Sequence, residues 1–329
     1  MLEFISRAFG EKVNESQIDF LTEELNNDTT KKILFFPNSC NKTTNFQGFL
    51  NKLYLKSNEQ QFIVLKFETL KGRIRRIELE SGKTFAKMRV SLDFLFLRVL
   101  PRLMLFKKLM RKLTRNKLIV LSKAEGLGRM VYAGFEIIET CTIDSDIFVI
   151  IKKSRSTNKY SKPSYGLIFK MDRIGKNEKL FGVYKIRTMH PYAEFLHEYI
   201  LKLNGYSSTG KPKNDFRVTT WGKLFRRYWI DELPQLLNVL KGEMKLVGIR
   251  PVSQTYYNEL NDQIKEKRRK QKPGCIPPYI ALNYSTSKES VIEAEMEYLR
   301  LKENNPYTTD LKLFFLTIYN ILLKKRRSA

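Results

Sequence analysis

The stretch that decides how this chain folds reads FRRYWIDELPQLLNVLKGEMKLVGIRP and runs from Phe225 to Pro251. It combines an arginine pair, an Asp–Glu pair, a leucine-rich segment, a glycine and a further arginine in one compact run. The leucines recur at i, i+3, i+4 and i+7, which is the spacing of one helix face, and Gly242 is a typical helix stop. The leucines are Leu233, Leu236, Leu237 and Leu240. The pattern predicts a one-sided helix that begins at the acid pair.

The acid pair, Asp231 and Glu232, falls at the N-terminus of that predicted helix. The helix macrodipole favours anions there and is expected to keep a carboxylate ionised. An ionised aspartate is a competent nucleophile toward phosphorus, and a neighbouring carboxylate suits Mg²⁺. We therefore predict both residues as catalytic residues and as metal ligands. The same pattern also fits an ordinary helix start without any catalytic role.

Three arginines flank the acid pair: Arg226, Arg227 and Arg250. Guanidinium groups form forked hydrogen bonds with phosphate and can neutralise its charge during transfer. Acidic and basic residues in this arrangement indicate chemistry on a phosphate.

The chain has 329 residues, of which 42% are hydrophobic, and this predicts two domains with proper cores. Lys and Arg outnumber Asp and Glu by 60 to 34, which gives a formal charge of +26. That excess implies anionic partners, namely nucleic acid, an anionic membrane surface or phosphorylated substrates. Charge alone does not choose among them.

The cysteines and the N-terminus favour a reducing cytoplasmic compartment. Cys40, Cys141 and Cys275 are widely spaced and odd in number, so they form neither a disulfide framework nor a metal pattern. The first 16 residues contain early acids and no long apolar run, which is unlike a signal peptide.

Two apolar segments with basic flanks suggest contact with a membrane. Residues 92–110 read LDFLFLRVLPRLMLFKKLM, and residues 311–323 lead directly into KKRR. Neither reaches the roughly 20 uninterrupted apolar residues of a spanning helix, and Pro101 would break the first one midway. We expect 92–110 to be interfacial or re-entrant. The alternative, especially for the C-terminal segment, is a core helix with a solvated basic end.

The predicted organisation is a domain over 1–152, a polar basic linker over 153–164 and a second domain over 165–329. In the first domain, strands are expected at 61–68, 135–139 and 146–153. Ser122 and Glu125 form a capping box for a helix that stops at Gly134. This order resembles the closing portion of a class I methyltransferase domain, so we expect a truncated Rossmann-like α/β fold. Such domains hold their cofactor with a glycine-rich loop after a strand, and that loop is missing.

In the second half, apolar runs around Gly175 predict a hairpin within 165–189. Thr219 or Thr220 is expected to cap the helix before the acid pair. Thr286, with Glu289 three residues on, is expected to cap a long helix that reaches about Lys302.

Several blocks of the second half resemble the bacterial sugar transferase family, the polyprenyl-phosphate hexose-1-phosphate transferases. The matching blocks are DRIGKNEKLFGVYKIRTM, NDFRVTTWGKLFRR, DELPQLLNVLKGEMKLVGIRP, KPG at 272–274 and TTDLKLFF. They cover Tyr165 to the C-terminus in family order. Several ordered blocks with similar spacing are far more specific than any single one.

The resemblance implies an α+β, monotopic, membrane-associated phosphoglycosyl transferase at the cytoplasmic face of the bacterial inner membrane. Asp231 would attack the sugar-bearing phosphate of a UDP-sugar and expel UMP. The covalent phosphosugar would then pass to a polyprenyl (undecaprenyl) phosphate, which starts a surface glycan, while Glu232 helps to hold Mg²⁺. Six residues fall at the family's basic positions for phosphate and nucleotide: Lys185, Arg187, Arg217, Arg226, Arg227 and Arg250.

The chain departs from the family pattern in two places. Strands and linker at 135–164 stand where the family has a long re-entrant hydrophobic helix, and Ile249 replaces a proline before Arg250. We hypothesise that 92–110 substitutes for the missing helix. The leading alternative is a catalytically silent, membrane-bound interaction subunit of a glycan-assembly complex. A nucleic-acid binder has charge as its only support, and a homodimer and the identity of the sugar stay open.

Overall fold

The computed structural model describes residues 1–21, 32–43, 45–96, 120–154, 163, 166–206 and 212–323. The chain divides into two compact units. The first unit comprises Met1–Ser164 with His190–Leu203, and the second comprises Tyr165–Met189 with Asn204–Ala329.

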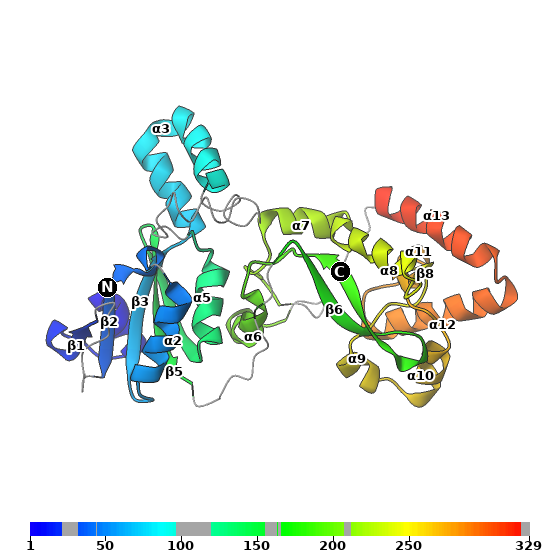
Figure 1. The fold of residues 1–329 in the computed structure, drawn as a ribbon, viewed down its shortest axis with the longest axis horizontal. Coiled ribbons are helices and arrows are strands. Elements are labelled where there is room, and N and C mark those ends of the chain that lie inside the picture. Colours follow the sequence, from blue (N-terminus) through cyan, green and yellow to red (C-terminus); the bar gives the residue numbers. More distant parts are fainter. Residues whose placement is uncertain are drawn as a thin grey trace. The chain divides into compact units, whose positions relative to one another are not determined.

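The first unit is built on a five-stranded sheet with the order β1-β2-β3-β5-β4 (Figure 1). The strands are β1 (Ile18–Phe20), β2 (Ile33–Ser39), β3 (Phe62–Glu68), β4 (Phe135–Ile143) and β5 (Asp146–Lys153). The first three run parallel, whereas β5 is antiparallel to both of its neighbours. The helices are α1 (Leu2–Phe9), α2 (Phe46–Lys56), α3 (Leu70–Phe94), α5 (Lys123–Tyr132) and α6 (His197–Asn204). The α/β class and the three expected strands are confirmed, while the likeness to a methyltransferase domain stays a prediction.

The core of this unit lies at the middle of the sheet. Several side chains of β3 and β5 have no exposed surface: Ile63, Val64, Leu65, Val149, Ile150 and Ile151. Strands that are covered on both faces read as nearly continuous apolar runs, and this is why both strands are recognisable in the sequence.

Helix α5 has the predicted cap at Ser122 and the predicted glycine after its end, while the Glu125 carboxylate pairs with Arg129. The Ser122 hydroxyl accepts a hydrogen bond from the Glu125 backbone N–H at 3.1 Å, and Gly134 follows the helix with φ +103°. A Cβ on Gly128 would lie 2.3 Å from the Tyr192 carbonyl oxygen. That glycine therefore serves close packing within the unit.

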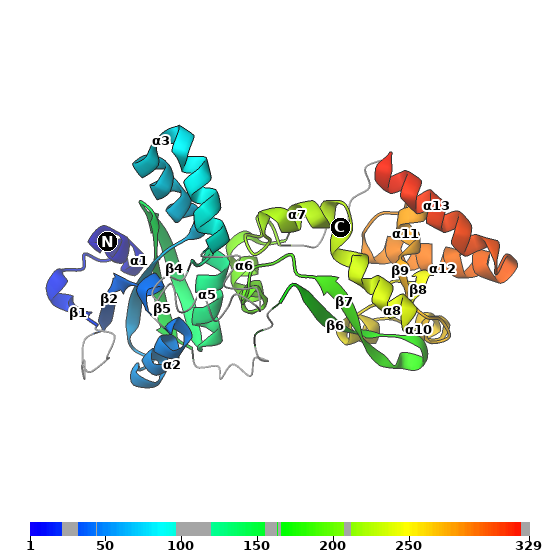
Figure 2. The same cartoon turned by 45° about the horizontal axis from the view of Figure 1, so that its top comes forward.

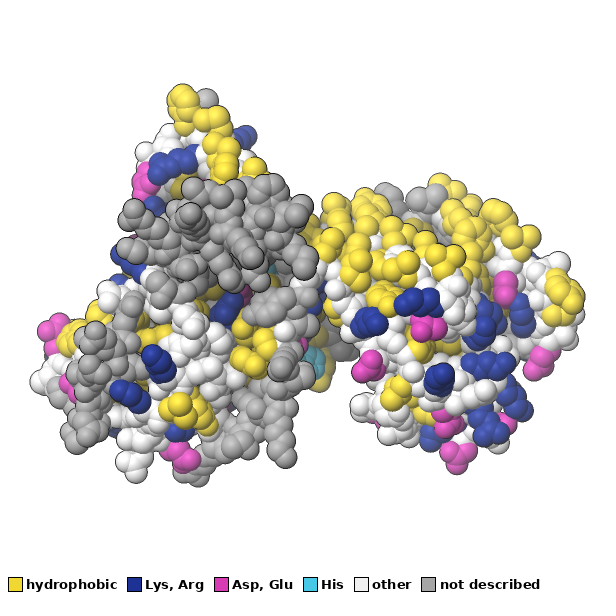
Figure 3. All heavy atoms as spheres, in the orientation of Figure 1, with side chains coloured by type: hydrophobic (Ala, Val, Ile, Leu, Met, Phe, Trp, Pro, Cys, Tyr) yellow, Lys and Arg dark blue, Asp and Glu magenta, His cyan; other side chains and the backbone are white. Residues whose placement is uncertain are grey.

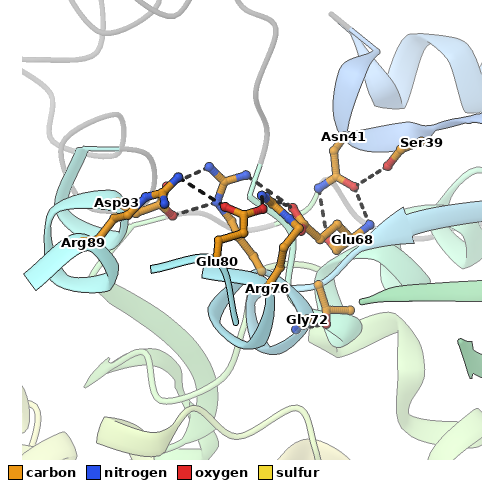
Figure 4. A network of polar contacts seen from close by, with 10 residues as sticks. Ser39, Asn41, Glu68, Gly72, Arg76, Glu80, Arg89 and Asp93 are labelled. Carbon is orange, nitrogen blue, oxygen red and sulfur yellow. Dashed lines mark hydrogen bonds and ion pairs between the residues drawn. The ribbon is translucent and has the colours of Figure 1, made fainter. Parts of the chain in front are cut away.

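Helix α3 is a hairpin of two arms, because Gly82 breaks it with φ +68° and ψ 158°. Ion pairs join the arms to each other and to the end of β3 (Figure 4). Of the predicted segment 92–110, the part from 97 onward lies outside the described residues, as do most of the linker 153–164 and the basic cluster at 324–327.

The second unit combines a hairpin with a short parallel strand pair (Figure 2). The strands are β6 (Ile168–Ile174), β7 (Leu180–Ile186), β8 (Lys245–Val247) and β9 (Gly274–Ile276). The helices are α7 (Thr220–Arg227), α8 (Leu236–Leu240), α9 (Gln254–Asn258), α10 (Asp262–Arg269), α11 (Pro278–Ala281), α12 (Lys288–Asn304) and α13 (Thr308–Leu322). The β6–β7 hairpin confirms the prediction around Gly175.

Strands β8 and β9 approach each other closely at two glycines. A Cβ on Gly274 would lie 2.1 Å from the Gly248 backbone nitrogen. The glycine of the KPG block is therefore required for this contact, which brings the loop after β8 beside Cys275.

Helix α7 starts as predicted, because the Thr219 hydroxyl accepts from the Gly222 N–H at 2.9 Å. Two other helix predictions were wrong in detail. The acid pair begins a 3-10 turn, Ile230–Gln235, and the α-helix after it has only five residues. Pro234 explains this, since it lacks the N–H that a continuous α-helix needs. Helix α12 is capped by the Ser287 hydroxyl rather than by Thr286.

Within the described residues, no helix combines the length and the apolar character needed to cross a bilayer.

Candidate active site

The acid pair lies at the start of the 3-10 turn in the second unit. Trp229 precedes the turn with φ +60°, a backbone conformation that non-glycine residues rarely adopt. The side chain of Asp231 is buried, with 6% of the residue exposed, whereas Glu232 keeps more contact with solvent. The turn thus points one carboxylate inward and leaves the other accessible.

Glu232 is held by two partners. The Lys185 Nζ on β7 lies 2.6 Å from its Oε1, and the Gln235 amide donates to its Oε2 at 2.7 Å. Lys185 and Glu232 are 47 positions apart in the sequence, so the packing of the hairpin against the 3-10 turn creates this ion pair.

Asp231 has a different environment. Its Oδ1 is buried and has no hydrogen-bond partner among the described residues. Burial raises the pKa of Asp231, and the charge of Glu232 adds to the rise, while Lys185 and Arg226 oppose it. The direction is opposite to the one expected from a helix terminus. The reason is that burial and the neighbouring Glu232 carboxylate outweigh the charges of Lys185 and Arg226.

A pocket opens beside the pair, and three of the predicted residues line it: Lys185, Glu232 and Arg250. Its other walls come from the hairpin, the 3-10 turn and the segment after β9. They are formed by Met171, Arg173, Val183, Trp229, Gln235, Pro251, Cys275, Pro277 and Tyr279. The pocket therefore gathers three cationic side chains around one carboxylate.

Arg173 and Arg250 supply two guanidinium groups to this pocket. The Arg173 guanidinium donates to the Asp172 carbonyl oxygen at 2.7 Å and to the Met171 sulfur at 3.4 Å, both of which are uncharged acceptors. Burial lowers the pKa of Arg173, and the charge of Arg250 lowers it further. Within the described part of the chain, neither guanidinium forms an ion pair with a carboxylate. Two such groups in one pocket are suited to a phosphate-bearing ligand.

A buried ion pair holds the backbone of Arg250. Its N–H donates to the Glu295 Oε1 at 2.9 Å, and its carbonyl oxygen accepts from the Arg268 guanidinium. Arg268 and Glu295 also pair with each other, and they are 4% and 1% exposed. The loop that carries Arg250 is thus fixed from both sides.

The other predicted basic residues lie outside the pocket lining. Arg226 donates to the Thr188 hydroxyl at 2.9 Å, and its charge acts on Asp231. The Arg217 guanidinium pairs with Asp215 at 2.7 Å. Arg187 donates to the Gly166 carbonyl at 3.0 Å, and Arg227 lies over the Tyr228 ring. The structure therefore brings Arg226 to the acid pair, whereas Arg187, Arg217 and Arg227 do not line the pocket.

Asn238 fastens the helix after the acid pair to the strand that carries Lys185. It is fully buried, and its Oδ1 accepts from the Tyr184 backbone N–H at 3.1 Å. Its Nδ2 donates to the Gly182 carbonyl at 2.8 Å and to the Glu243 carboxylate at 2.7 Å.

Asn238→Ala is expected to lower the free energy of unfolding of the second unit by about 2–3 kcal/mol, because buried groups on β7 lose their partners. Urea unfolding followed by tryptophan fluorescence measures this, since both tryptophans, Trp221 and Trp229, belong to the second unit. Asn258→Ala is the control, because Asn258 is exposed on α9 and should change stability by less than about 0.5 kcal/mol. Equal effects of the two substitutions would contradict the role of Asn238.

The acid pair is the only predicted metal site, and the donors present suit Mg²⁺. The described residues contain no cluster of three or more His, Cys, Asp or Glu side chains that could hold an ion alone. Mg²⁺ is usually bound by one or two carboxylates together with substrate phosphates and water. The unpartnered Oδ1 of Asp231 beside the Glu232 carboxylate fits that mode.

Sequence reasoning missed several residues of this site. Arg173 stands in the DRIGK block, and its place next to Arg250 follows only from the folded hairpin. Gln235 could have been found from its i+3 spacing to Glu232. Cys275 follows the KPG block, and burial together with Glu232 raises the pKa of its thiol to about 12. No pattern in the sequence predicts the ion pair between Arg268 and Glu295.

The fold and the site define a mixed α/β protein with an acid pair beside a cationic pocket. A family model described as bacterial sugar transferase matches residues 140–324, which is more than half of the chain. The chain therefore belongs to the bacterial sugar transferase family.

Individual relatives agree with this assignment. The galactosyl transferase CpsE of Streptococcus agalactiae is 35% identical over 163 residues, which are 47% of this chain and 34% of that protein. The uncharacterized sugar transferase EpsL of Bacillus subtilis is 34% identical over 161 residues, 48% of this chain and 71% of that protein. The undecaprenyl-phosphate galactose phosphotransferase of Salmonella typhimurium is 41% identical over 90 residues, 26% and 19% of the two chains. The match thus spans only about a third of the streptococcal relative's length.

Proposed function

We propose that the second unit transfers a sugar-1-phosphate from a UDP-sugar to a polyprenyl phosphate and so initiates the synthesis of a surface polysaccharide. The observation that carries this proposal is the pocket in which Glu232 meets Lys185, Arg173 and Arg250 next to the buried Asp231. One relative, 41% identical over 90 residues, is named undecaprenyl-phosphate galactose phosphotransferase. That name supports the same reaction.

In the proposed first step, an Asp231 oxygen attacks the phosphorus that bears the sugar. The bond between that phosphorus and the bridging oxygen breaks, and UMP leaves with the electron pair. The product is an aspartyl phosphosugar. In the second step, an oxygen of polyprenyl phosphate attacks the same phosphorus, which releases the Asp231 carboxylate and forms a polyprenyl diphosphosugar.

The side chains around the pocket each have a task in this scheme. Lys185, Arg173 and Arg250 bind the diphosphate oxygens and stabilise the charge that develops on them. Asp231 and Glu232 would hold Mg²⁺, which when bound supplies further neutralisation of phosphate charge. Gln235 keeps the Glu232 carboxylate oriented.

The exposed apolar surface of the second unit supports action at a membrane, where a polyprenyl phosphate resides. Figure 3 shows hydrophobic side chains gathered over α7, α8 and α13. These residues are each at least 38% exposed: Trp221, Leu224, Tyr228, Leu233, Leu236, Leu237, Leu240, Leu311, Phe315, Ile318 and Tyr319. So large a patch marks an interaction surface. We assign it to the cytoplasmic face of the bacterial inner membrane, with the chain monotopic or peripheral.

UMP release tests the reaction. The full-length chain is incubated in nanodiscs with undecaprenyl phosphate, Mg²⁺ and a panel of UDP-sugars. Release with one donor, together with a sugar-bearing lipid product, is the expected result and identifies the sugar. No release with any donor would contradict the proposal and favour a catalytically silent interaction subunit.

Leu240→Ser combined with Phe315→Ser is expected to lower partitioning onto phosphatidylglycerol vesicles at least about tenfold, because two large side chains lose apolar burial. Sedimentation with vesicles measures the change. Leu180→Ser is the control, since Leu180 on β7 is 57% exposed but lies outside the patch. If Leu180→Ser weakened binding equally, the patch would not be the contact surface.

A further inference from the structure

The first unit carries a second apolar surface, on the α3 hairpin, which the proposed transfer does not use. In the second arm of the hairpin, Phe85, Met88 and Leu92 are 67%, 59% and 47% exposed. They follow one another at i, i+3 and i+7, so they share one face of the helix. Leu95 and Phe96 continue the same stripe and are 42% and 47% exposed.

This stripe lies opposite the side on which the two arms pack. Ala86 on the second arm is 2% exposed and Ile77 on the first arm is 3% exposed. At 100° per residue, Ala86 and Asp93 point away from the stripe, and Asp93 bonds to Arg73 on the first arm. The second arm is thus covered on one face only, and its apolar residues on the other face contact solvent.

Ion pairs hold the hairpin in shape, so the stripe is a fixed feature. Asp93 accepts two hydrogen bonds from the Arg73 guanidinium, each at 2.7 Å, across the two arms. Arg89 pairs with Glu80 at 3.3 Å, and Arg76 pairs with Glu68 at the end of β3 at 2.7 Å (Figure 4). At the base, a Cβ on Gly72 would lie 1.9 Å from the Ser145 carbonyl oxygen, so the first arm packs directly on the β4–β5 turn.

The charge of the hairpin indicates what covers the stripe. Residues 70–94 contain seven Lys and Arg but only three Asp and Glu. Two of the three acids, Glu80 and Asp93, are already engaged by arginines. Figure 3 shows basic side chains beside the hydrophobic ones on α3. An apolar stripe flanked by cationic residues is the pattern of a helix that lies in the interface of an anionic bilayer.

We propose that the α3 hairpin is an anionic-lipid-binding element that inserts Phe85, Met88 and Leu92 into the headgroup boundary. The hairpin gives the first unit its own membrane contact, independent of the transfer reaction and of the patch on the second unit.

Hydrogen–deuterium exchange on the full-length chain tests this, because it resolves α3 from the second unit. The probes are phosphatidylcholine vesicles with and without phosphatidylglycerol. We expect slowed exchange at 85–96 with the anionic vesicles only, and weaker protection at high salt. In Phe85→Ser/Met88→Ser/Leu92→Ser, the protection at α3 should disappear and partitioning should fall at least about tenfold, while α13 stays protected.

Leu55→Ser is the matched control, because Leu55 is 79% exposed on α2 of the same unit, and it should keep the protection at α3. Unchanged exchange at 85–96 with every vesicle would overturn the proposal. Protection without vesicles that grows with protein concentration would assign the stripe to a second copy. Protection without vesicles at every concentration would assign it to another segment of the chain. UMP release in detergent should persist in the triple variant. Loss of lipid binding with normal UMP release therefore distinguishes a defect in the hairpin from a failure of the proposed reaction.

Discussion

Asp231→Asn should reduce UMP release by at least about 10³-fold, since an amide cannot form the aspartyl phosphosugar. The substitution keeps the size of the side chain. Because Asp231 is buried and its Oδ1 has no partner among the described residues, the neutral amide should not weaken the fold through a lost ion pair. The loss should therefore appear in kcat, with the circular dichroism spectrum unchanged.

Glu232→Gln provides the comparison. It removes the partner of Lys185 and one candidate Mg²⁺ ligand, but leaves the nucleophile in place. Some release should persist at raised Mg²⁺ concentration.

Mass spectrometry of the wild type with UDP-sugar and without acceptor should show a covalent sugar-phosphate adduct on the peptide that contains Asp231. Equal UMP release by wild type and Asp231→Asn would rule this residue out as the nucleophile.

Glu295→Leu should lower the free energy of unfolding of the second unit by about 3–5 kcal/mol, because it leaves the buried Arg268 guanidinium without its counter-charge. The double substitution Arg268→Met/Glu295→Leu should recover most of that loss, since an apolar pair can replace a buried ion pair at little cost. Urea unfolding measures both.

Activity should not recover in the double variant. Glu295 and Arg268 are the partners of the Arg250 backbone N–H and carbonyl, so the loop loses both restraints. We expect a KM for the UDP-sugar that is raised about tenfold or more, with a smaller change in kcat, because a loosened Arg250 weakens phosphate binding. A stable double variant with wild-type KM would show that the ion pair supports the fold without positioning Arg250.

The strands and caps were predictable because their signals are local. The apolar runs of β3 and β5 and the hydroxyl caps at Ser122 and Thr219 depend on neighbours within a few residues. The leucines after the acid pair are all exposed, and the single helix face predicted for them is divided between a 3-10 turn and a five-residue helix. Their spacing does not say what covers that face, and Leu240 is 84% exposed.

The candidate site was only partly predictable, because only some of its features depend on residues that are close together in the sequence. The residue types around Asp231 indicated phosphate chemistry, but the direction of its pKa depends on burial and on where Lys185 points, which are tertiary features. Arg173 and the Arg268–Glu295 pair join segments that are far apart in the chain. The hydrophobic periodicity of helices and strands does not predict such contacts.

The protonated thiol of Cys275 has a practical consequence for work on this protein. The thiolate is the form that attacks alkylating reagents, and a thiol whose pKa is raised to about 12 is almost entirely protonated near neutral pH. Cys275 lines the pocket yet should resist iodoacetamide and air oxidation. Cys141, which is partly exposed, would be labelled first. A fluorophore attached at Cys141 therefore labels the first unit and leaves the Cys275 thiol unmodified.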